Sequence, residues 1–402
     1  MTVWIVSQFY HPEENATGYL LTRLAEGLAG QFGVKVLCTF PSDKRVRSVT
    51  PRDEVLHGVV IRRCFSTFFD KDNLIFRLLN ALAICVSVFF ALLRRLQAAD
   101  HVLVVTNPPL LPFAASVAAR IKRGRCSIIV HDVYPEAMVA VGVAGPSSLI
   151  VRFLDFVHRY LYRRVDRIVV LGRDMELLVA RKTENGNKKI VRIPNGAEVG
   201  TIVPDDRTQN RLLNGLGLSS KFVVANVGNM GRTHGIENLF ACTQLLSQDK
   251  TIHFLFVGNG AKKRWLEEEV RKTKAENITI LPYDSRESQS VVNNACDVVI
   301  ISFIAGMNGI SVPSRMYNVM SAGKPIIAVA EQDSELALVI EEEGIGWLVP
   351  PDKPELIVEA IRRACADRGV LAGMGIRARE AAVRKYSFQK VIDSYRAMLL
   401  HG

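Results

Sequence analysis

Short apolar runs alternate with longer amphipathic segments along most of the 402-residue chain. Runs such as VLVV and SIIV are continuous, which is typical of parallel strands covered on both faces of a sheet. In the first half they predict strands at residues 3–7, 35–38, 101–106, 127–131 and 167–171. Helices are predicted between them, near residues 20–32, 112–121 and 149–164. The first half is therefore predicted to be an α/β domain built on a parallel sheet.

The second half repeats this alternation after a segment, IPNGAEVGTIVPDDRTQNR, that has the composition of an interdomain linker. The chain length also suits two domains of about 200 residues each. We place the N-terminal domain at 1–197 and the C-terminal domain at 198–386. The last helix, 387–402, is expected to pack back on the first domain. Two Rossmann-like parallel-sheet domains of this kind would face each other across a cleft, where ligands often bind.

One apolar segment, LLNALAICVSVFFALL at residues 78–93, stands out between flanking arginines. Only Asn80 and Ser87 are polar in it, yet it is shorter than the ~20 residues that span a bilayer. It is either a buried core helix or a helix half-sunk in a membrane interface, and we favour the second. The predicted membrane-facing residues are Val88, Phe89, Leu92, Arg94 and Arg95.

Charge supports a membrane partner. The chain has a net charge of +11, and residues 1–200 hold 27 Lys/Arg against 17 Asp/Glu. No RNP-like aromatic motif or zinc-ligand spacing is evident, so an anionic membrane surface is favoured over nucleic acid.

The seven scattered cysteines indicate buried thiols in a reducing compartment. The start, MTVWIVSQFY, predicts a first strand and not a signal peptide. We expect a cytoplasmic protein, peripheral on the inner face of the cell membrane.

Three strand–loop–helix units follow one another in the second half. FVVANVGNMGRTHG (222–235) and IHFLFVGNG (252–260) are strands ending in glycine loops, and VPSRMYNVMSAGKP (312–325) opens a helix with Pro313 and Ser314. Such loops gather at the carboxyl edge of a parallel sheet, where ligands bind. Helix starts and arginines favour anions there. The predicted donor-diphosphate site comprises Gly231, Arg232, Ser314 and Arg315.

The order of these motifs resembles glycosyltransferase family 4 over nearly the whole chain. IPNGAE (193–198) precedes the three units, and GIGWLVPPD (344–352) follows them. HDVYPE (131–136) and VPSR narrow the likeness to the bacterial branch that makes O-antigen, capsule and colanic-acid-type polysaccharides. The resemblance implies a GT-B fold and the transfer of a sugar from a nucleotide-diphosphate sugar with retention of anomeric configuration. The implied donor nucleotide is UDP. It further implies nucleotide contacts from Gly258, Asn259, Gly260, Tyr283, Asn318 and Glu335. Glu335 is equally well explained as a charge at a helix N-terminus.

Two loops of the first domain are predicted to present groups to the acceptor and the transferred sugar. Tyr10, His11 and Gly18 follow the first strand and are expected to face the cleft. Asp132, then Glu136, then His131 are the predicted catalytic residues at the end of another strand. A lone strand-end aspartate is often only a helix cap, but two carboxylates in HDVYPE favour function.

The second half of the sequence departs from the family pattern at three positions. His234 stands where a lysine is expected, and a histidine is only partly charged near neutral pH. Ile310 and Asn318 stand where the family commonly has two glutamates. Arg232 and Arg315 would then stabilise the leaving diphosphate. We identify no DxD motif of the type that holds a metal–diphosphate complex, so no metal or other cofactor is expected. Front-side attack and a covalent intermediate on Asp132 or Glu136 both remain open.

The predicted function is a retaining glycosyltransferase. It would move a hexose, N-acetylhexosamine or deoxy-N-acetylhexosamine to a membrane-associated glycan acceptor linked to polyprenyl diphosphate. One alternative is a GT-B-shaped UDP-sugar 2-epimerase, which needs no acceptor. The other is a non-catalytic membrane assembly partner, which would bind donor without turnover.

Overall fold

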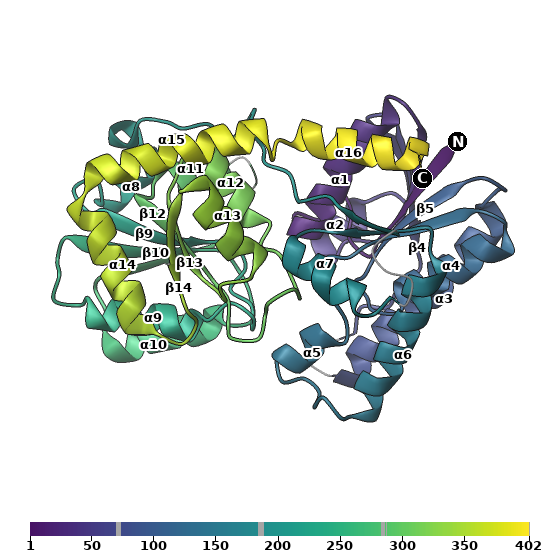
Figure 1. Cartoon of the computed structure of the whole chain (residues 1–402), viewed down its shortest axis with the longest axis horizontal. Helices are drawn as coiled ribbons and strands as arrows, with labels where there is room; N and C mark the ends of the chain where they lie inside the picture. Colours follow the sequence, from purple (N-terminus) through teal and green to yellow (C-terminus); the bar gives the residue numbers. More distant parts are fainter. Residues whose placement is uncertain (70–73, 184–188, 283–285, 287, 402) are drawn as a thin grey trace. The chain divides into compact units, whose positions relative to one another are not determined.

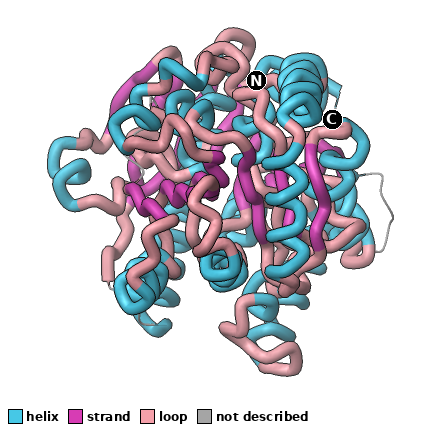
Figure 2. Tube along the Cα trace, turned by 90° about the vertical axis from the view of Figure 1, so that its left-hand side faces the viewer, coloured by secondary structure: helices cyan, strands magenta, loops and turns pink. Residues whose placement is uncertain are grey.

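The computed structural model describes residues 1–69, 74–183, 189–282, 286 and 288–401. It divides into two compact units. Unit 1 comprises residues 1–194 and 391–402, and unit 2 comprises residues 195–390. Each unit is an α/β domain with a sheet of parallel strands between helices, as predicted (Figures 1 and 2).

Unit 1 has an eight-stranded sheet in the order β3-β4-β2-β1-β5-β6-β7-β8. Its strands are β1 Thr2–Val6, β2 Gly33–Thr39, β3 Asp53–Leu56, β4 Val59–Cys64, β5 His101–Val105, β6 Arg125–Ile129, β7 Arg167–Val170 and β8 Ile190–Arg192. Its helices are α1 Ala16–Ala29, α2 Lys44–Val49, α3 Leu74–Arg95, α4 Leu111–Ile121, α5 Glu136–Ala140, α6 Leu149–Arg164 and α7 Arg173–Ala180, together with most of α16 Phe388–His401. All pairings are parallel except that of β3 with β4, an antiparallel hairpin turned at His57 and Gly58, both with positive φ.

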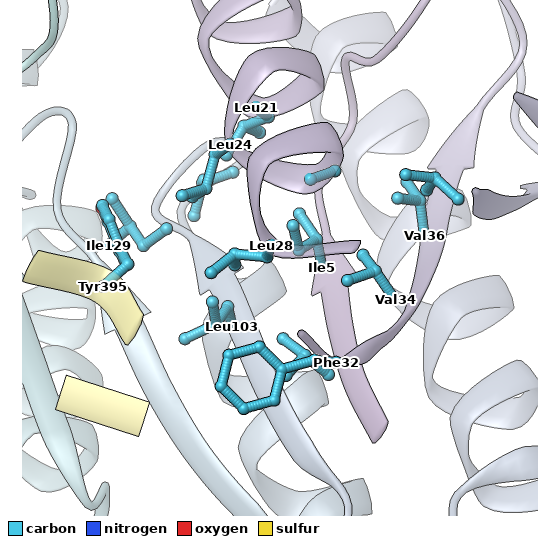
Figure 3. Close-up of a cluster of buried hydrophobic side chains, with 14 of the residues drawn as sticks. Ile5, Leu21, Leu24, Leu28, Phe32, Val34, Val36, Leu103, Ile129 and Tyr395 are labelled. Carbon is cyan, nitrogen blue, oxygen red and sulfur yellow. The ribbon is translucent and has the colours of Figure 1, made fainter. Parts of the chain in front are cut away.

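The core on one face of this sheet joins α1 and α16 to the central strands (Figure 3). Leu21, Leu24 and Leu28 of α1 recur at helical spacing and pack on Ile5 of β1. Val391, Tyr395, Met398 and Leu399 of α16 belong to the same core. The Arg396 guanidinium donates to the carbonyl of Gly27 at 2.6 Å, which fixes the last helix against α1.

Helix α3 corrects part of the membrane prediction. It is long and apolar enough to cross a bilayer by length and composition, and 28% of its most apolar stretch is buried. Val88 and Leu92 are fully buried, so they face the protein core and not a membrane. Phe89 is half-buried, whereas Arg94 and Arg95 are exposed. The outward face of α3 carries a different apolar set.

Unit 2 has a six-stranded parallel sheet in the order β11-β10-β9-β12-β13-β14. The strands are β9 Phe222–Val227, β10 Ile252–Val257, β11 Ile278–Leu281, β12 Val298–Ser302, β13 Ile326–Val329 and β14 Gly346–Val349. The helices are α8 Arg211–Leu216, α9 Ile236–Leu245, α10 Lys263–Thr273, α11 Gln289–Asn294, α12 Arg315–Ser321, α13 Glu335–Glu343, α14 Pro354–Ala366 and α15 Arg368–Arg384.

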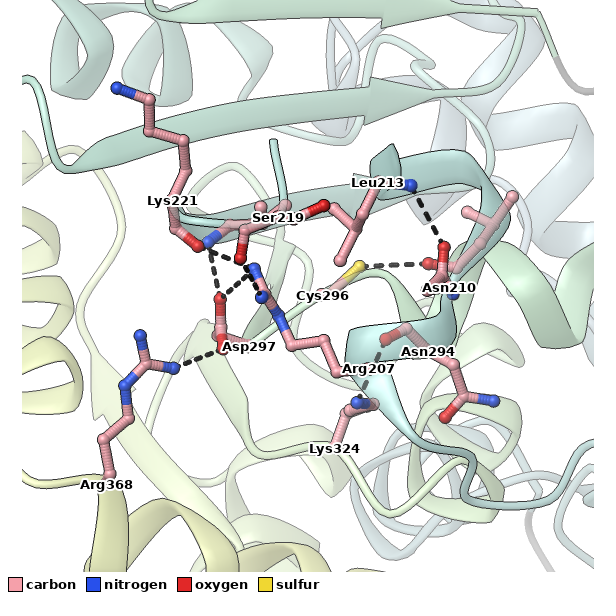
Figure 4. Close-up of polar contacts among 12 residues, drawn as sticks. Arg207, Asn210, Leu213, Ser219, Lys221, Asn294, Cys296, Asp297, Lys324 and Arg368 are labelled. Carbon is pink, nitrogen blue, oxygen red and sulfur yellow. Dashed lines mark hydrogen bonds and ion pairs between the residues drawn. The ribbon is translucent and has the colours of Figure 1, made fainter. Parts of the chain in front are cut away.

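A polar cluster around Asp297 fastens the amino edge of this sheet (Figure 4). Its carboxylate accepts from the Val223 amide at 2.7 Å and pairs with Arg207 at 3.1 Å and with Arg368. Asp297 is buried, so its charge requires these partners. The cluster joins β9, the start of β12 and the start of α15 at the edge opposite to the glycine loops.

Candidate functional site

The predicted diphosphate site lies at the carboxyl edge of the unit 2 sheet. From β9 the chain moves to β10 and β11 on one side, and then to β12 and β13 on the other. The strand order therefore reverses between β9 and β12, and ligands of open α/β sheets bind outside such a point. The loops that follow β9 and β12 meet here, because the Ile304 amide donates to the Thr233 carbonyl at 3.0 Å.

The two glycine loops interlock by backbone contact. The Met230 amide donates to the Asn259 carbonyl at 2.8 Å, and the Lys262 amide donates to the Met230 carbonyl at 2.9 Å. Gly258 has φ +155°, and a Cβ there would lie 1.8 Å from the Gly228 carbonyl oxygen. At Gly260, φ +148°, a Cβ would lie 2.5 Å from the Met230 carbonyl. Glycine is required at both positions because two backbones approach closely.

Arg315 brings a positive charge to this edge. Its Nη1 lies 3.4 Å from Asn226 Oδ1 and from the carbonyl oxygens of Val227 and Asn229. Its Nε and Nη2 atoms are buried and have no hydrogen-bond partner among the described residues. Burial lowers the pKa of the guanidinium to about 10, so it stays cationic at neutral pH. Arg315 as a whole is half-buried, and a cation with two buried nitrogens whose donors are unused fits an anionic ligand.

His234 corrects the expectation of a partly charged clamp. Its ring packs against Phe303, with centroids 5.6 Å apart, and its Nδ1 lies 3.0 Å from Thr233 Oγ1. Burial, and then the charge of Arg315, lower the pKa of His234 well below its usual value. The imidazole is therefore neutral at physiological pH. His234 therefore adds no positive charge beside the glycine loop to that of Arg232 and Arg315.

The other predicted donor contacts occupy varied positions around this edge. Gly231 is buried, whereas Arg232, Asn259 and Gly260 are exposed. The side chain of Ser314 makes no capping hydrogen bond at the start of α12. Glu335 is buried at the first position of α13. Tyr283 lies outside the described residues.

Asn318 is held by the linker segment. Its side-chain oxygen accepts from the Glu198 amide at 3.1 Å, which ties IPNGAE to α12. Asn318 is buried, and this hydrogen bond occupies a side chain that stands where the family commonly has a glutamate. The nucleotide contact predicted for Asn318 stays a prediction.

Sequence reasoning missed Glu331, which organises the loop between β12 and α12. Its carboxylate accepts from the Gly306 amide at 3.1 Å and from the Asn308 amide at 2.8 Å. Glu331 is the second residue after the end of β13, so its chain position near a strand terminus was the signal that could have identified it. By holding this loop, Glu331 positions the segment that leads to Arg315.

In unit 1, the HDVYPE segment follows β6 and is held by threonines. The amides of His131 and Asp132 both donate to Thr106 Oγ1, at 3.2 and 3.3 Å. His131 Nδ1 lies 3.4 Å from Thr17 Oγ1 at the start of α1. Burial lowers the pKa of His131 to about 4, so the ring is neutral at physiological pH. These contacts bring the β6 terminus next to α1.

Glu136 belongs to an ion-pair cluster. Its carboxylate lies 2.6 Å from the Lys182 ammonium, which also pairs with Asp155 at 2.8 Å. Lys182 is almost fully buried and additionally donates to the Tyr134 carbonyl at 3.3 Å. This cluster holds the HDVYPE loop on α6 and the end of α7. The ion pair therefore gives Glu136 a structural role, and no catalytic role is needed to explain it. Asp132 is half-buried and remains the stronger catalytic prediction.

The loop after β1 differs from expectation. Tyr10 is 2% exposed and lies in the unit 1 core, so the prediction that it faces a ligand is wrong. Gly18 is buried at the start of α1, where an added Cβ would lie 2.7 Å from the Glu13 carbonyl oxygen. Its role is close packing. His11 is exposed, and its carbonyl accepts from Arg63 at 2.8 Å.

The expectation about metals needs one correction in the sequence itself. Asp70-Lys71-Asp72 has the DxD spacing, although these residues lie outside the described part of the chain. Among the described residues, no group of three or more His, Cys, Asp or Glu side chains is arranged to hold a metal ion. Metal independence stays a prediction.

Comparison with known protein families matches both halves of the chain. Residues 17–196 match the family described as "Glycosyl transferase 4-like domain", and residues 211–381 match "Glycosyl transferases group 1". A Pseudomonas aeruginosa protein named "Probable glycosyltransferase WbjE" is 32% identical over 371 residues, which is 90% of this chain and 89% of that protein. An Escherichia coli K12 protein, "Putative colanic acid biosynthesis glycosyl transferase WcaI", is 24% identical and covers 79% of this chain and 78% of its own length.

Solved structures share the fold over the full chain. The sucrose-phosphate synthase of Thermosynechococcus elongatus aligns with a TM-score of 0.82 at 17% identity, covering 100% of both chains. Anabaena HepE, solved with UDP and glucose, aligns at 0.76 with 15% identity, and the lipopolysaccharide-biosynthesis glycosyltransferase WaaG at 0.75 with 14%, each with the same coverage. The chain therefore belongs to the group 1 and family 4-like glycosyltransferases of GT-B fold, and it is a transferase related to enzymes of polysaccharide biosynthesis.

Proposed function

We propose that this enzyme is a retaining glycosyltransferase that uses a UDP-sugar and a membrane-associated glycan acceptor linked to polyprenyl diphosphate. The sugar would be a hexose, an N-acetylhexosamine or a deoxy-N-acetylhexosamine, and the product would enter surface polysaccharide synthesis at the cytoplasmic face of the cell membrane. The name of the WcaI relative supports the polysaccharide assignment. The HepE complexes with UDP and with UDP-glucose support the choice of donor nucleotide.

The observation that carries the proposal is the unused hydrogen-bonding capacity of Arg315. Its buried Nε and Nη2 atoms have no partner among the described residues, and its Cδ and Nη1 atoms lie beside Gly228 of the glycine loop. Leaving a buried cation with unused donors costs free energy. A diphosphate offers paired anionic oxygens that a guanidinium binds in a two-pronged manner, which would remove that cost.

The chemistry places negative charge next to this arginine. In the transfer step, the bond between the anomeric carbon and the β-phosphate oxygen breaks, and both electrons leave with UDP. Arg315, helped by the exposed Arg232, would stabilise the diphosphate as that charge develops. The acceptor hydroxyl oxygen forms the new bond at the anomeric carbon on the same face. Its proton passes to the departing phosphate oxygen, so no separate carboxylate base is required.

A covalent route would need a carboxylate as nucleophile. The ion pairs of Glu136 with Lys182 favour a structural role for that residue. Asp132 is then the carboxylate that the covalent route would require. Replacement of Asp132 by Asn separates the routes, because front-side attack retains transfer activity whereas the covalent route loses it.

Binding of UDP tests the assignment of Arg315. Replacing Arg315 by Ala should weaken UDP binding about 10- to 100-fold in isothermal titration calorimetry, because a charge-assisted hydrogen bond contributes roughly 1.5–3 kcal/mol. Arg264→Ala is the matched control, since it removes an arginine whose side chain is 90% exposed from the same unit and should leave affinity unchanged. Arg315→Lys keeps the positive charge but loses the two-pronged guanidinium. Its UDP affinity should therefore lie between the affinities of Arg315→Ala and Arg264→Ala. Equal UDP affinity in all variants would overturn the site assignment.

A further inference from the structure

The outward face of α3 is a continuous apolar stripe. Ile75, Leu79, Leu82, Val86 and Phe90 are each 41–67% exposed and recur every three or four residues. At 3.6 residues per turn they share one face of the helix. The opposite face, with Ile84, Val88 and Leu92, is buried. This helix is therefore apolar both toward the protein and away from it.

Helix α6 has the same double character. Leu149, Phe153, Phe156 and Tyr160 are 81%, 55%, 69% and 41% exposed and again recur at helical spacing. The residues between them, Val151, Leu154, Val157 and Leu161, are buried against unit 1. A solvent-facing side of a helix is ordinarily polar, so a row of four exposed aliphatic and aromatic side chains needs a partner surface.

The two stripes belong to one layer of helices. Helix α3 packs on α4, and α4 packs on α6 (Figure 1). Phe113 of α4 and Tyr160 of α6 have ring centroids 6.3 Å apart, and both are partly exposed. Beside α3, the exposed Phe69 packs on Phe76 with centroids 5.4 Å apart. The apolar surface thus extends across neighbouring elements of unit 1.

Exposed arginines border this surface. Arg77, Arg94 and Arg95 lie toward the two ends of α3, and Arg152 and Arg164 lie on α6. Unit 1 as a whole holds 28 lysines and arginines against 17 aspartates and glutamates, a net charge of +11. The entire excess positive charge of the chain therefore resides in the unit that carries the apolar surface.

We propose that the outward faces of α3 and α6 together form a docking surface that lies in the headgroup region of an anionic lipid bilayer. Apolar and aromatic side chains would enter the acyl boundary while the arginines contact lipid phosphates. A second copy of this chain is a poorer occupant, because a two-fold contact would bring like-charged arginines together. Only the role of this docking, which is to give access to a lipid-linked acceptor, rests on the proposed function.

Vesicle sedimentation tests this proposal with the full chain. Wild type should bind vesicles of phosphatidylcholine with phosphatidylglycerol at least tenfold better than phosphatidylcholine alone, and binding should weaken as salt is raised. The variant Leu82→Gln/Val86→Gln/Phe90→Gln, and separately Phe153→Ser/Phe156→Ser, should each lower binding to anionic vesicles at least tenfold.

The matched control changes exposed apolar residues of unit 2. Val370, Ile376 and Val383 lie on α15 and are 44%, 62% and 45% exposed, and their replacement by Gln should leave vesicle binding unchanged. Calorimetry with UDP, performed on every variant, shows that the nucleotide site is folded and reports on the proposed function independently.

Three outcomes would overturn the docking surface. One is vesicle binding by the α3 and α6 variants that equals wild type. Another is equal binding of wild type to neutral and anionic vesicles. The third is that wild type does not bind vesicles but forms a dimer in solution, and that the α3 and α6 variants are monomers. A second copy of the chain would then be the occupant of the surface. Loss of UDP binding with vesicle binding intact would instead contradict the proposed function alone.

Discussion

At the scale of single residues, the proposed donor site depends on close backbone contact more than on a carboxylate. Gly228, Gly258 and Gly260 let two loops interlock, and Arg315 lies directly beside Gly228, where an added Cβ would be 3.3 Å from its Cδ. The positions that the family commonly fills with glutamate hold Ile310 and Asn318, and both are buried. Because neither position carries a glutamate, the proposed charged contact to a diphosphate is the cationic Arg315.

Gly258 offers a direct test of the interlocked loops. In Gly258→Ala the new Cβ would clash with the Gly228 carbonyl, so we expect the free energy of unfolding to fall by about 3 kcal/mol. We also expect UDP affinity to fall at least tenfold, because the loops beside Arg315 must separate. The measurements are urea denaturation and calorimetry with UDP.

The control for this change is Gly217→Ala. Gly217 also has positive φ, +66°, but an added Cβ meets nothing within 4 Å. It should cost only the backbone strain of about 1 kcal/mol and leave UDP affinity intact. If the two variants behave alike, contact between the loops has no special importance.

The sequence indicated the glycines, Arg232 and Arg315 because strand–glycine–helix units have a fixed place at a sheet edge. It could not indicate that His234 is neutral, since its pKa depends on burial beside Arg315. Tyr10 was misplaced for a similar reason. A tyrosine after a strand can turn toward either the loop or the core, and the local pattern does not distinguish the two.

At the scale of elements, helix α3 shows where periodicity stops being informative. LLNALAICVSVFFALL is apolar on every side, so no hydrophobic pattern indicates which face is buried. The rotation is set by packing and by Asn80, whose side chain bonds Thr67 at 2.7 Å and the backbone of Phe69. The hairpin of β3 and β4 was missed too, although His57-Gly58 between two apolar runs is a turn signal.

Helix α6 makes the stability of unit 1 sensitive to acid. His158 is fully buried, packed between the rings of Tyr134 and Tyr162. Burial, reinforced by the charge of Lys182, lowers the pKa of His158 to about 4. The unfolded chain binds a proton below its ordinary value of about 6.5, whereas the folded chain does not until about pH 4. The stability that neutral His158 contributes is therefore fully present above pH 6.5 and is lost as the pH falls from 6.5 toward 4.

The variant His158→Phe tests this contribution. It keeps an aromatic ring in the site but cannot titrate, so its stability should fall less steeply between pH 6.5 and 4. The difference in slope should be about 1.4 kcal/mol per pH unit. Urea denaturation at a series of pH values measures it. Identical slopes in the two proteins would show that His158 is not neutral in the folded state.

At the scale of the whole molecule, two α/β units were predictable because continuous apolar strands alternate with helices throughout. The predicted boundary follows residue 197, and the units divide after Pro194. Helix α16 belongs mainly to unit 1, since an amphipathic last helix must bury its apolar face on some surface. The glycosyltransferase activity follows from the family, whereas the donor sugar depends on pocket details that no motif reports.

The NMR spectrum of a reaction in excess EDTA tests the proposed sugar transfer most directly. A UDP-sugar labelled with carbon-13 at the anomeric carbon would be supplied with and without a glycan acceptor linked to polyprenyl diphosphate. We expect UDP release and a new glycosidic signal with the anomeric configuration of the donor only when acceptor is present, and we expect this signal to be lost in Arg315→Ala. A 2-epimer formed without acceptor, an inverted product or the absence of any turnover with every donor would contradict the proposed transfer.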